Sequence, residues 1–284
     1  MKQSELRTYL EVAYARYHRA EFLSLDPLQM AHRYERAEDR EVAALIAAAF
    51  ASGNIKAILA ALEGVMGAMG SRPAKWLRDQ SPKDLRGAFS GVRHRWVMEQ
   101  DIEVLMALLG ETLRRHGTLG RLWREVDDAK EEDACAALGR FVDAIVAMPI
   151  GELSRRNREV RRADGRVTTL APIDSILLTS PARGSACKRM NLFLRWVARP
   201  DDGVDLGLWT EFLSPARLTM PVDTHVLRIS RRLRLTKRKL ADMRAAQEIT
   251  ARLRKISPED PCRYDFSFVR MGVEEKMGMG NGEF

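Results

Sequence analysis

The stretch EVAALIAAAFASGNIKAILAALEGVMGAMG, residues 41–70, decides the fold class of this chain. Apolar side chains recur in it at the three- and four-residue spacing of a core-facing helix, and its many alanines are the strongest helix formers. The polar SGN at 52–54 interrupts the pattern. The stretch therefore predicts two helices joined by a turn.

The same periodicity predicts further helices along the chain, over residues 99–117, 131–148, 185–199, 223–233 and 239–256. Strand signals are nearly absent, and RVTTLAP (166–172) is the one short segment that indicates an extended piece. The arginine-rich 154–166 is typical of a surface link between elements. An all-α fold is the resulting prediction.

The chain has 284 residues, which allows one large domain or two lobes around a cleft. Its hydrophobic fraction of 45% is enough for a packed core. No apolar run is long enough to cross a bilayer, and MKQSELRTYL at the start lacks the pattern of a signal peptide. We expect a soluble cytoplasmic protein with no membrane partner.

The three cysteines are far apart and form no C-x-x-C pair: Cys135, Cys187 and Cys262. This spacing disfavours a disulfide framework, a structural zinc site and a four-cysteine iron–sulfur cluster. We expect no metal and no cofactor, so ordinary side chains must carry any chemistry.

Positive charge is concentrated in the second half of the chain. Residues 1–150 carry 21 Lys and Arg against 22 Asp and Glu, whereas 215–256 alone carry 12 against 3. Such a basic stretch favours a polyanionic partner, most simply nucleic acid. A solvated charged surface is the alternative.

A candidate phosphate-binding turn precedes a lysine that is a candidate nucleophile. TSPARGSACK (179–188) has Pro181 and Gly184 between two predicted helices, and Lys188 and Arg189 fall in the first turn of the second. The positive end of a helix disfavours an ammonium group, which favours the neutral, nucleophilic amine. An ordinary helix connection and a solvated lysine are the alternatives.

One acid stands before the most basic helix, in MPVDTHVLRISRRL (220–233). Asp223 is placed to cap that helix, although Thr224 could do so instead. The basic residues Arg228, Arg231 and Arg232 follow. Asp223 is therefore a helix cap, a catalytic carboxylate, or both.

Together these segments resemble the helix-hairpin-helix superfamily of DNA glycosylases, in which a lysine follows the hairpin and an aspartate lies in a P-V-D-x-H-V-x-R segment. Lys188 and Asp223 stand in those places, 35 positions apart. This long separation between the lysine and the aspartate is most similar to that in the archaeal 8-oxoguanine DNA glycosylases. The hairpin departs from the usual L-P-G-V-G pattern, because Ala182 and Arg183 replace two of its residues.

The chain also resembles an uncharacterised bacterial domain-of-unknown-function family related to these glycosylases. The resemblance rests on residues 39–55, 184–199, 203–209, 220–233 and 257–273. It implies one helical glycosylase-like unit over 1–284, with two lobes around a cleft and a helix-hairpin-helix element. The hairpin and catalytic segment would span 177–233, and 278–284 would be a flexible tail.

The resemblance implies a base-excision repair glycosylase with AP-lyase activity, which removes an oxidised purine such as 8-oxoguanine from damaged duplex DNA. Lys188 and Asp223 would be the catalytic residues. DNA contacts would come from Gly184, Ser185, Arg189, Arg228, Arg231 and Arg232, with a monovalent cation at the hairpin as an open alternative to no cofactor. The base pocket would draw on Asn54, Lys56, Phe193, Trp196 and Trp209.

A purely structural role is the alternative interpretation for several of the residues named here. At least one of Phe193 and Trp196 is expected to be a core residue, and SGN (52–54) can simply be an inter-helix turn. In YDF (264–266), Asp265 is expected to cap a helix or to pair with an arginine.

The alternative to an enzyme is a non-catalytic helix-hairpin-helix nucleic-acid-binding protein, and a weaker alternative is an RNA-binding helical protein. In each case we expect a monomer that is cytoplasmic and nucleoid-associated.

Overall fold

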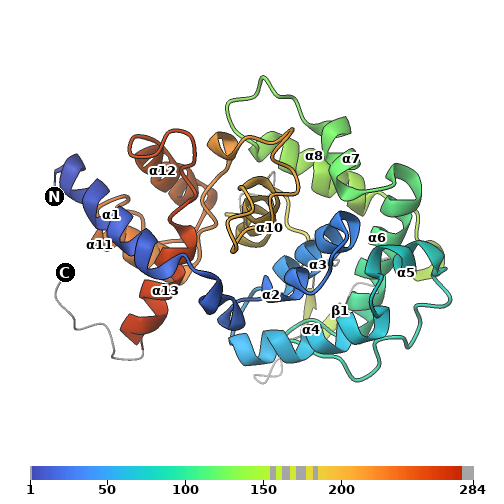
Figure 1. The fold of residues 1–284 in the computed structure, drawn as a ribbon. Coiled ribbons are helices and arrows are strands. Elements are labelled where there is room, and N and C mark those ends of the chain that lie inside the picture. Colours follow the sequence, from blue (N-terminus) through green and yellow to red (C-terminus); the bar gives the residue numbers. More distant parts are fainter. Residues whose placement is uncertain (1, 154–157, 162–166, 171–176, 182–184, 277–284) are drawn as a thin grey trace. The chain divides into compact units, whose positions relative to one another are not determined.

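The computed structural model describes residues 2–153, 158–161, 167–170, 177–181 and 185–276, and the chain divides into two compact units. Unit 1 comprises residues 1–26, 128–136 and 181–284, and unit 2 comprises 27–127 and 137–180. The helices of both units are drawn in Figure 1.

Unit 2 is built on the predicted helix pair. Its helices are α2 (Gln29–His32), α3 (Ala37–Phe50), α4 (Ile55–Met69), α5 (Pro73–Asp79), α6 (Glu99–His116), α7 (Leu119–Val126), most of α8 (Cys135–Val146) and the 3-10 turn η2 (Gly151–Leu153). Every residue of α3 from Glu41 onward is buried, and 51–54 form the predicted joint with α4. The helix predicted over 99–117 is also confirmed, since α6 ends where Gly117 takes a φ of 80°.

A short antiparallel ribbon is the exception to this helical pattern. It joins β1 (Arg158–Arg161) to β2 (Val167–Leu170), with Arg158 opposite Leu170. The extended piece predicted within 166–172 is thus present, whereas the surface link predicted over 154–166 contains a strand. Most described residues are helical, which confirms the all-α class. None of the described helices is both long and apolar enough to cross a membrane.

The contact between α5 and α6 gives a stability prediction. A Cβ added at Gly110 of α6 would lie 2.6 Å from the backbone oxygen of Leu77 in α5, whereas a Cβ at Gly67 of α4 would meet nothing within 4 Å. Gly110→Ala should therefore destabilise the protein by about 1–3 kcal/mol through overpacking. The matched Gly67→Ala should stabilise it by about 0.5–1 kcal/mol, because alanine favours the helix.

Urea unfolding followed by circular dichroism measures both changes. Equal effects of the two substitutions would show that helix propensity, and not the close approach of α5 and α6, governs these positions.

Unit 1 holds the remaining elements: α1 (Gln3–Tyr17), the 3-10 turn η1 (Ala20–Leu25), α10 (Lys188–Ala198), the 3-10 turn η4 (Pro215–Arg217), α11 (Thr224–Arg232), α12 (Met243–Arg254) and α13 (Asp265–Lys276). Helix α10 is its core element, because every residue from Met190 to Ala198 is buried. Helix α13 packs against both α11 and α1. The approach to α11 is close at Gly272, where a Cβ would lie 3.0 Å from Cβ of His225.

The loop 204–209 closes the last turn of α10. The backbone N–H of Leu206 donates to the carbonyl oxygen of Trp196, and that of Trp209 donates to Val197, both at 2.7 Å. Carbonyls at a helix end otherwise lack partners, so these bonds stabilise the end of α10. They also hold Asp205, which directly precedes Leu206, beside the buried face of this helix.

Candidate active site around Lys188 and Asp223

Asp223 caps α11, as its sequence position predicts. Its Oδ1 accepts hydrogen bonds from the backbone N–H groups of His225 at 2.8 Å and Val226 at 2.9 Å. The preceding chain is fixed as well, because the N–H of Met220 donates to Thr250 Oγ1 of α12 at 2.9 Å. The cap uses one carboxylate oxygen and leaves Oδ2 for another contact.

Lys188 lies in the first turn of α10, as predicted, and is its first residue, because the helix begins at 188 and not at 185. The residue before it, Cys187, is fully buried and has a φ of 47°, in the left-handed region that residues other than glycine rarely occupy. This backbone conformation turns the chain sharply at the residue that precedes α10. Such an unfavourable backbone conformation persists only where the surrounding structure holds it in place, and it is often found at functional sites.

The structure brings these two side chains together. Lys188 Nζ lies 3.6 Å from Asp223 Oδ2, although the residues are 35 positions apart in the chain. Each side chain is 26% exposed, so the pair is accessible to a ligand while most of its surface is covered. An amine and a carboxylate in one accessible place can supply a nucleophile and a negative charge to the same substrate.

Asp265, at the start of α13, is a third charged residue near this pair. It is 1% exposed, its Oδ2 accepts from Arg195 Nη1 at 2.7 Å, and its Oδ1 has no hydrogen-bond partner among the described residues. Burial raises the pKa of Asp265 to about 6; Arg195 and Lys188 oppose this effect, and the charge of Asp223 adds to it. The expected pairing of Asp265 with an arginine is confirmed. Its charge is part of the electrostatic environment of the site.

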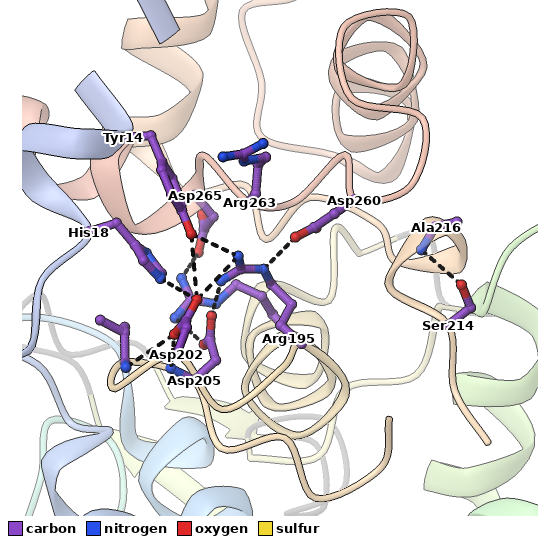
Figure 2. Close-up of polar contacts among 12 residues, drawn as sticks. Tyr14, His18, Arg195, Asp202, Asp205, Ser214, Ala216, Asp260, Arg263 and Asp265 are labelled. Atoms are coloured by element: carbon purple, nitrogen blue, oxygen red, sulfur yellow. Dashed lines mark hydrogen bonds and ion pairs between the residues drawn. The ribbon is translucent and has the colours of Figure 1, made fainter. Parts of the chain in front are cut away.

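The Asp265–Arg195 pair belongs to a larger buried ion cluster on α10 (Figure 2). Arg195 Nη2 donates to Asp205 Oδ1 at 3.0 Å, and Arg199 Nη1 donates to the other oxygen of Asp205. Arg199 Nε also donates to Asp260 Oδ2 at 2.7 Å. Buried charges are costly unless paired, and here guanidinium and carboxylate groups alternate.

Three residues at the edge of this cluster have the composition of a metal site. One ligand atom from each of His18, Asp202 and Asp205 lies within 4.8 Å of the others. However, the guanidinium of Arg199 pairs with both carboxylates, at 3.5 Å for Asp202. A fixed cation therefore already occupies the position between them. Burial favours a higher pKa for Asp202, but the hydrogen bond from His18 and the charge of Arg199 hold it below its usual range.

Comparison with known families adds one finding to this geometry. Residues 26–274 match the family model described as a protein of unknown function, DUF2400. The chain belongs to the DUF2400 family. Neither the curated proteins nor the solved structures give a match. The predicted membership of an uncharacterised family is thus confirmed, and the relation to DNA glycosylases stays a prediction.

In this DUF2400 protein, four of the predicted DNA-binding residues lie where solvent can reach them. Ser185, Arg228, Arg231 and Arg232 are exposed, and Arg189 is half-buried. Two of the arginines also make contacts inside unit 1, since Arg228 donates to the carbonyl oxygen of Gly272 at 2.7 Å and Arg232 to Tyr9 Oη at 3.3 Å.

The structure of this DUF2400 protein describes only part of the predicted hairpin. Gly184, and with it the turn expected to hold a monovalent cation, lies at 182–184, outside the described residues. Residues 171–176, which precede the hairpin, also lie outside them, and 177–180 are not helical. Only the second helix of the predicted pair, α10, is therefore described.

The aromatic residues predicted for a base pocket are core residues of the DUF2400 fold. Phe193, Trp196 and Trp209 are each 0% exposed, and Phe193 contacts Trp209 edge-on with ring centroids 5.2 Å apart. A ring enclosed on all sides has no face on which a base can stack. These three assignments are corrected: helix α10 turns its aromatic face inward, as core packing requires.

The two polar base-pocket candidates lie in unit 2, and one of them, Asn54, has an evident structural role. Asn54 caps α4, because its Oδ1 accepts from the backbone N–H of Lys56 at 2.9 Å and of Ala57 at 3.4 Å. Both Asn54 and Lys56 are exposed. The interpretation of SGN as an inter-helix turn is confirmed, and contact with a base is not required to explain either residue.

Proposed function

We propose that this protein is a DNA glycosylase with AP-lyase activity, which removes an oxidised purine such as 8-oxoguanine from duplex DNA. The observation that carries the proposal is the 3.6 Å contact between Lys188 Nζ and Asp223 Oδ2, with both side chains partly accessible. The basic composition of 215–256 and the resemblance of the two segments to helix-hairpin-helix glycosylases support it.

Lys188 is the nucleophile in this proposal. The target nucleotide first leaves the base stack, at a cost of a few kcal/mol. Lys188 Nζ, after losing a proton to water, attacks C1′ and forms an N–C bond while the C1′–N bond to the base breaks. The base leaves with the electron pair and takes a proton from water. The new secondary ammonium then loses a proton to water, the C1′–O4′ bond breaks as the nitrogen lone pair forms a C=N bond, and O4′ takes a proton from water, which gives the protonated Schiff base.

Strand cleavage and release of the enzyme follow from that Schiff base. Loss of a C2′ proton expels the 3′-phosphate by elimination, and water then hydrolyses the imine to regenerate the lysine. This sequence needs no oxidant, reductant or cofactor.

Asp223 is the electrostatic partner in this proposal. Breakage of an N-glycosidic bond builds positive charge on the sugar, as in sugar hydrolysis generally. The Oδ2 oxygen, which is not used by the helix cap, stabilises that charge. Exposed arginines on α11 contribute phosphate contacts, which make binding salt-dependent.

Borohydride trapping tests the role of Lys188. Wild-type protein, incubated with duplex DNA containing an abasic site and then reduced, should form a covalent protein–DNA adduct, because borohydride converts the imine to a stable amine. Lys188→Gln should abolish the adduct. The control Lys255→Gln changes an exposed lysine of the same unit and should leave it unchanged.

The same trapping assay, repeated with duplexes that each carry one defined lesion and combined with a measurement of base release, distinguishes the alternatives. Base release without trapping would remove the lyase assignment and keep the glycosylase. DNA binding with neither base release nor trapping, across duplexes that each carry one defined lesion, would contradict the enzyme and identify a binding protein.

A further inference from the structure

The segment TKRKLADMR, residues 236–244 (the 236–244 loop), comprises most of the connection from α11 to α12 and the first two residues of α12, and carries an exposed apolar side chain among cations. Leu240 is 72% exposed, more than any other large hydrophobic residue in the described part of the chain. Lys237 and Lys239 on either side are exposed as well. An apolar tip flanked by positive charge fits a surface that is both anionic and able to admit a hydrophobic group.

This loop is held by several contacts at its base. Thr236 Oγ1 accepts from the N–H of Arg238 at 3.1 Å and donates to Glu248 Oε2 of α12 at 2.7 Å. Arg238 forms two hydrogen bonds to Asp242, at 3.0 and 2.7 Å, so the acid of the loop is neutralised internally. In the sequence, Leu240 lies midway between Arg238 and Asp242, which pair with each other. Little conformational entropy is therefore lost when Leu240 binds a partner.

The loop is also joined to the segment that carries the candidate nucleophile. Asp242 forms an antiparallel β-bridge with Ser185, and Ser185 Oγ accepts from the N–H of Cys187 at 3.2 Å, directly before Lys188. Beside the bridge, the surface is hollowed between Arg238, Asp242, Met243 and Arg244. The exposed leucine and the Lys188–Asp223 pair therefore belong to one connected part of unit 1.

We propose that the 236–244 loop binds duplex DNA and inserts Leu240 as a wedge between base pairs next to the nucleotide that reaches Lys188. This inference rests on the proposed function and names how the same site holds its substrate. Apolar side chains that enter a base step unstack it partially and kink the duplex. Lys237, Lys239 and Arg244 contact the flanking phosphates, and this local positive charge favours DNA over an uncharged protein partner.

The test uses a duplex that contains a tetrahydrofuran abasic analogue with 2-aminopurine as the neighbouring base. The analogue lacks the C1′ hydroxyl group, so its ring cannot open to an aldehyde and cannot form a Schiff base, and binding is measured apart from chemistry. Wild-type protein should raise the 2-aminopurine fluorescence as that base unstacks. Leu240→Ala should lose this rise and bind the analogue duplex about tenfold more weakly, with less than about twofold change for the intact duplex.

Two further variants complete the experiment. Leu25→Ala, which truncates another exposed leucine of unit 1 (51% exposed), should change neither fluorescence nor affinity. The double variant Lys237→Gln/Lys239→Gln should reduce the slope of log K against log salt concentration by about 2, one phosphate contact per lysine.

The outcomes separate this inference from the proposed function. A normal fluorescence rise in Leu240→Ala, or equal weakening on both duplexes, overturns the wedge even if Lys188 is trapped by borohydride. Loss of the rise in Leu240→Ala supports the wedge even if no lesion is excised. Failure of the wild-type protein to bind any duplex overturns both proposals, and retention by an immobilised acidic peptide that depends on Leu240 would assign the loop to a protein partner.

Discussion

Asp223→Asn should lower the rate of base release about 100- to 1,000-fold, the usual cost of removing one electrostatic group from a transition state. The substitution separates the two roles of this residue. Asparagine is as good a helix cap as aspartate, so its oxygen can still accept from the N–H groups of His225 and Val226. The negative charge that faces Lys188 is lost, and with it the stabilisation of the cationic sugar.

The measurement is single-turnover release of 8-oxoguanine from a duplex with enzyme in excess, accompanied by urea unfolding of each variant. Asp223→Asn should keep the wild-type free energy of unfolding within about 0.5 kcal/mol, whereas Asp223→Ala should lose about 1 kcal/mol with the cap. If Asp223→Asn releases the base at more than a third of the wild-type rate, the carboxylate is only a cap.

Asp205→Ala should destabilise the protein by about 3–5 kcal/mol, the cost of leaving buried charge without its partner. Asp205 is 0% exposed and accepts from both Arg195 and Arg199. Without it, Arg195 retains only Asp265 and Arg199 retains Asp202 and Asp260 as acidic partners among the described residues. The two buried guanidinium groups, whose charges repel each other, would then lack the carboxylate that pairs with both.

Denaturant unfolding followed by tryptophan fluorescence measures this change. Asp205→Asn, which keeps the shape and removes the charge, should lose most of the same free energy and so exclude a simple cavity effect. The surface pair Lys75–Asp79 is the control, because both side chains are more than half exposed. Lys75→Ala should cost less than about 1 kcal/mol, and an equally small loss for Asp205→Ala would show that the buried cluster contributes little.

Helical periodicity predicted most of the fold. The apolar spacing in 41–70 gave α3, α4 and the turn between them, since local pattern and burial coincide there. The sequence did not indicate α5, because Pro73 and the polar residues around it are typical of a joint. Proline is favoured in the first turn of a helix, and tertiary packing against α6 decides the outcome.

The contact between Lys188 and Asp223 could be predicted from the sequence, whereas the residues that surround this pair could not. Asp223 and Lys188 were found because each stands at a helix start, where charge and backbone interact strongly. The aromatic assignments failed because spacing places Phe193 and Trp196 on one face of a helix but does not say whether that face turns inward. The ion cluster depends on Asp205 and Asp265, whose partners on α10 are distant in sequence; acids within largely apolar segments were the available signal.

The two ends of helix α10 have different roles: its first residue is the candidate nucleophile, and its last turns hold the buried ion cluster. Its last turns are fastened by Arg195, Arg199 and the loop 204–209, far from its first residue. The first residue, Lys188, owes its position to that distant anchorage. Residues around the amine can therefore be substituted without loss of the contacts that fix the far end of α10, so under the proposed function substrate fit and the stability of unit 1 depend on different residues.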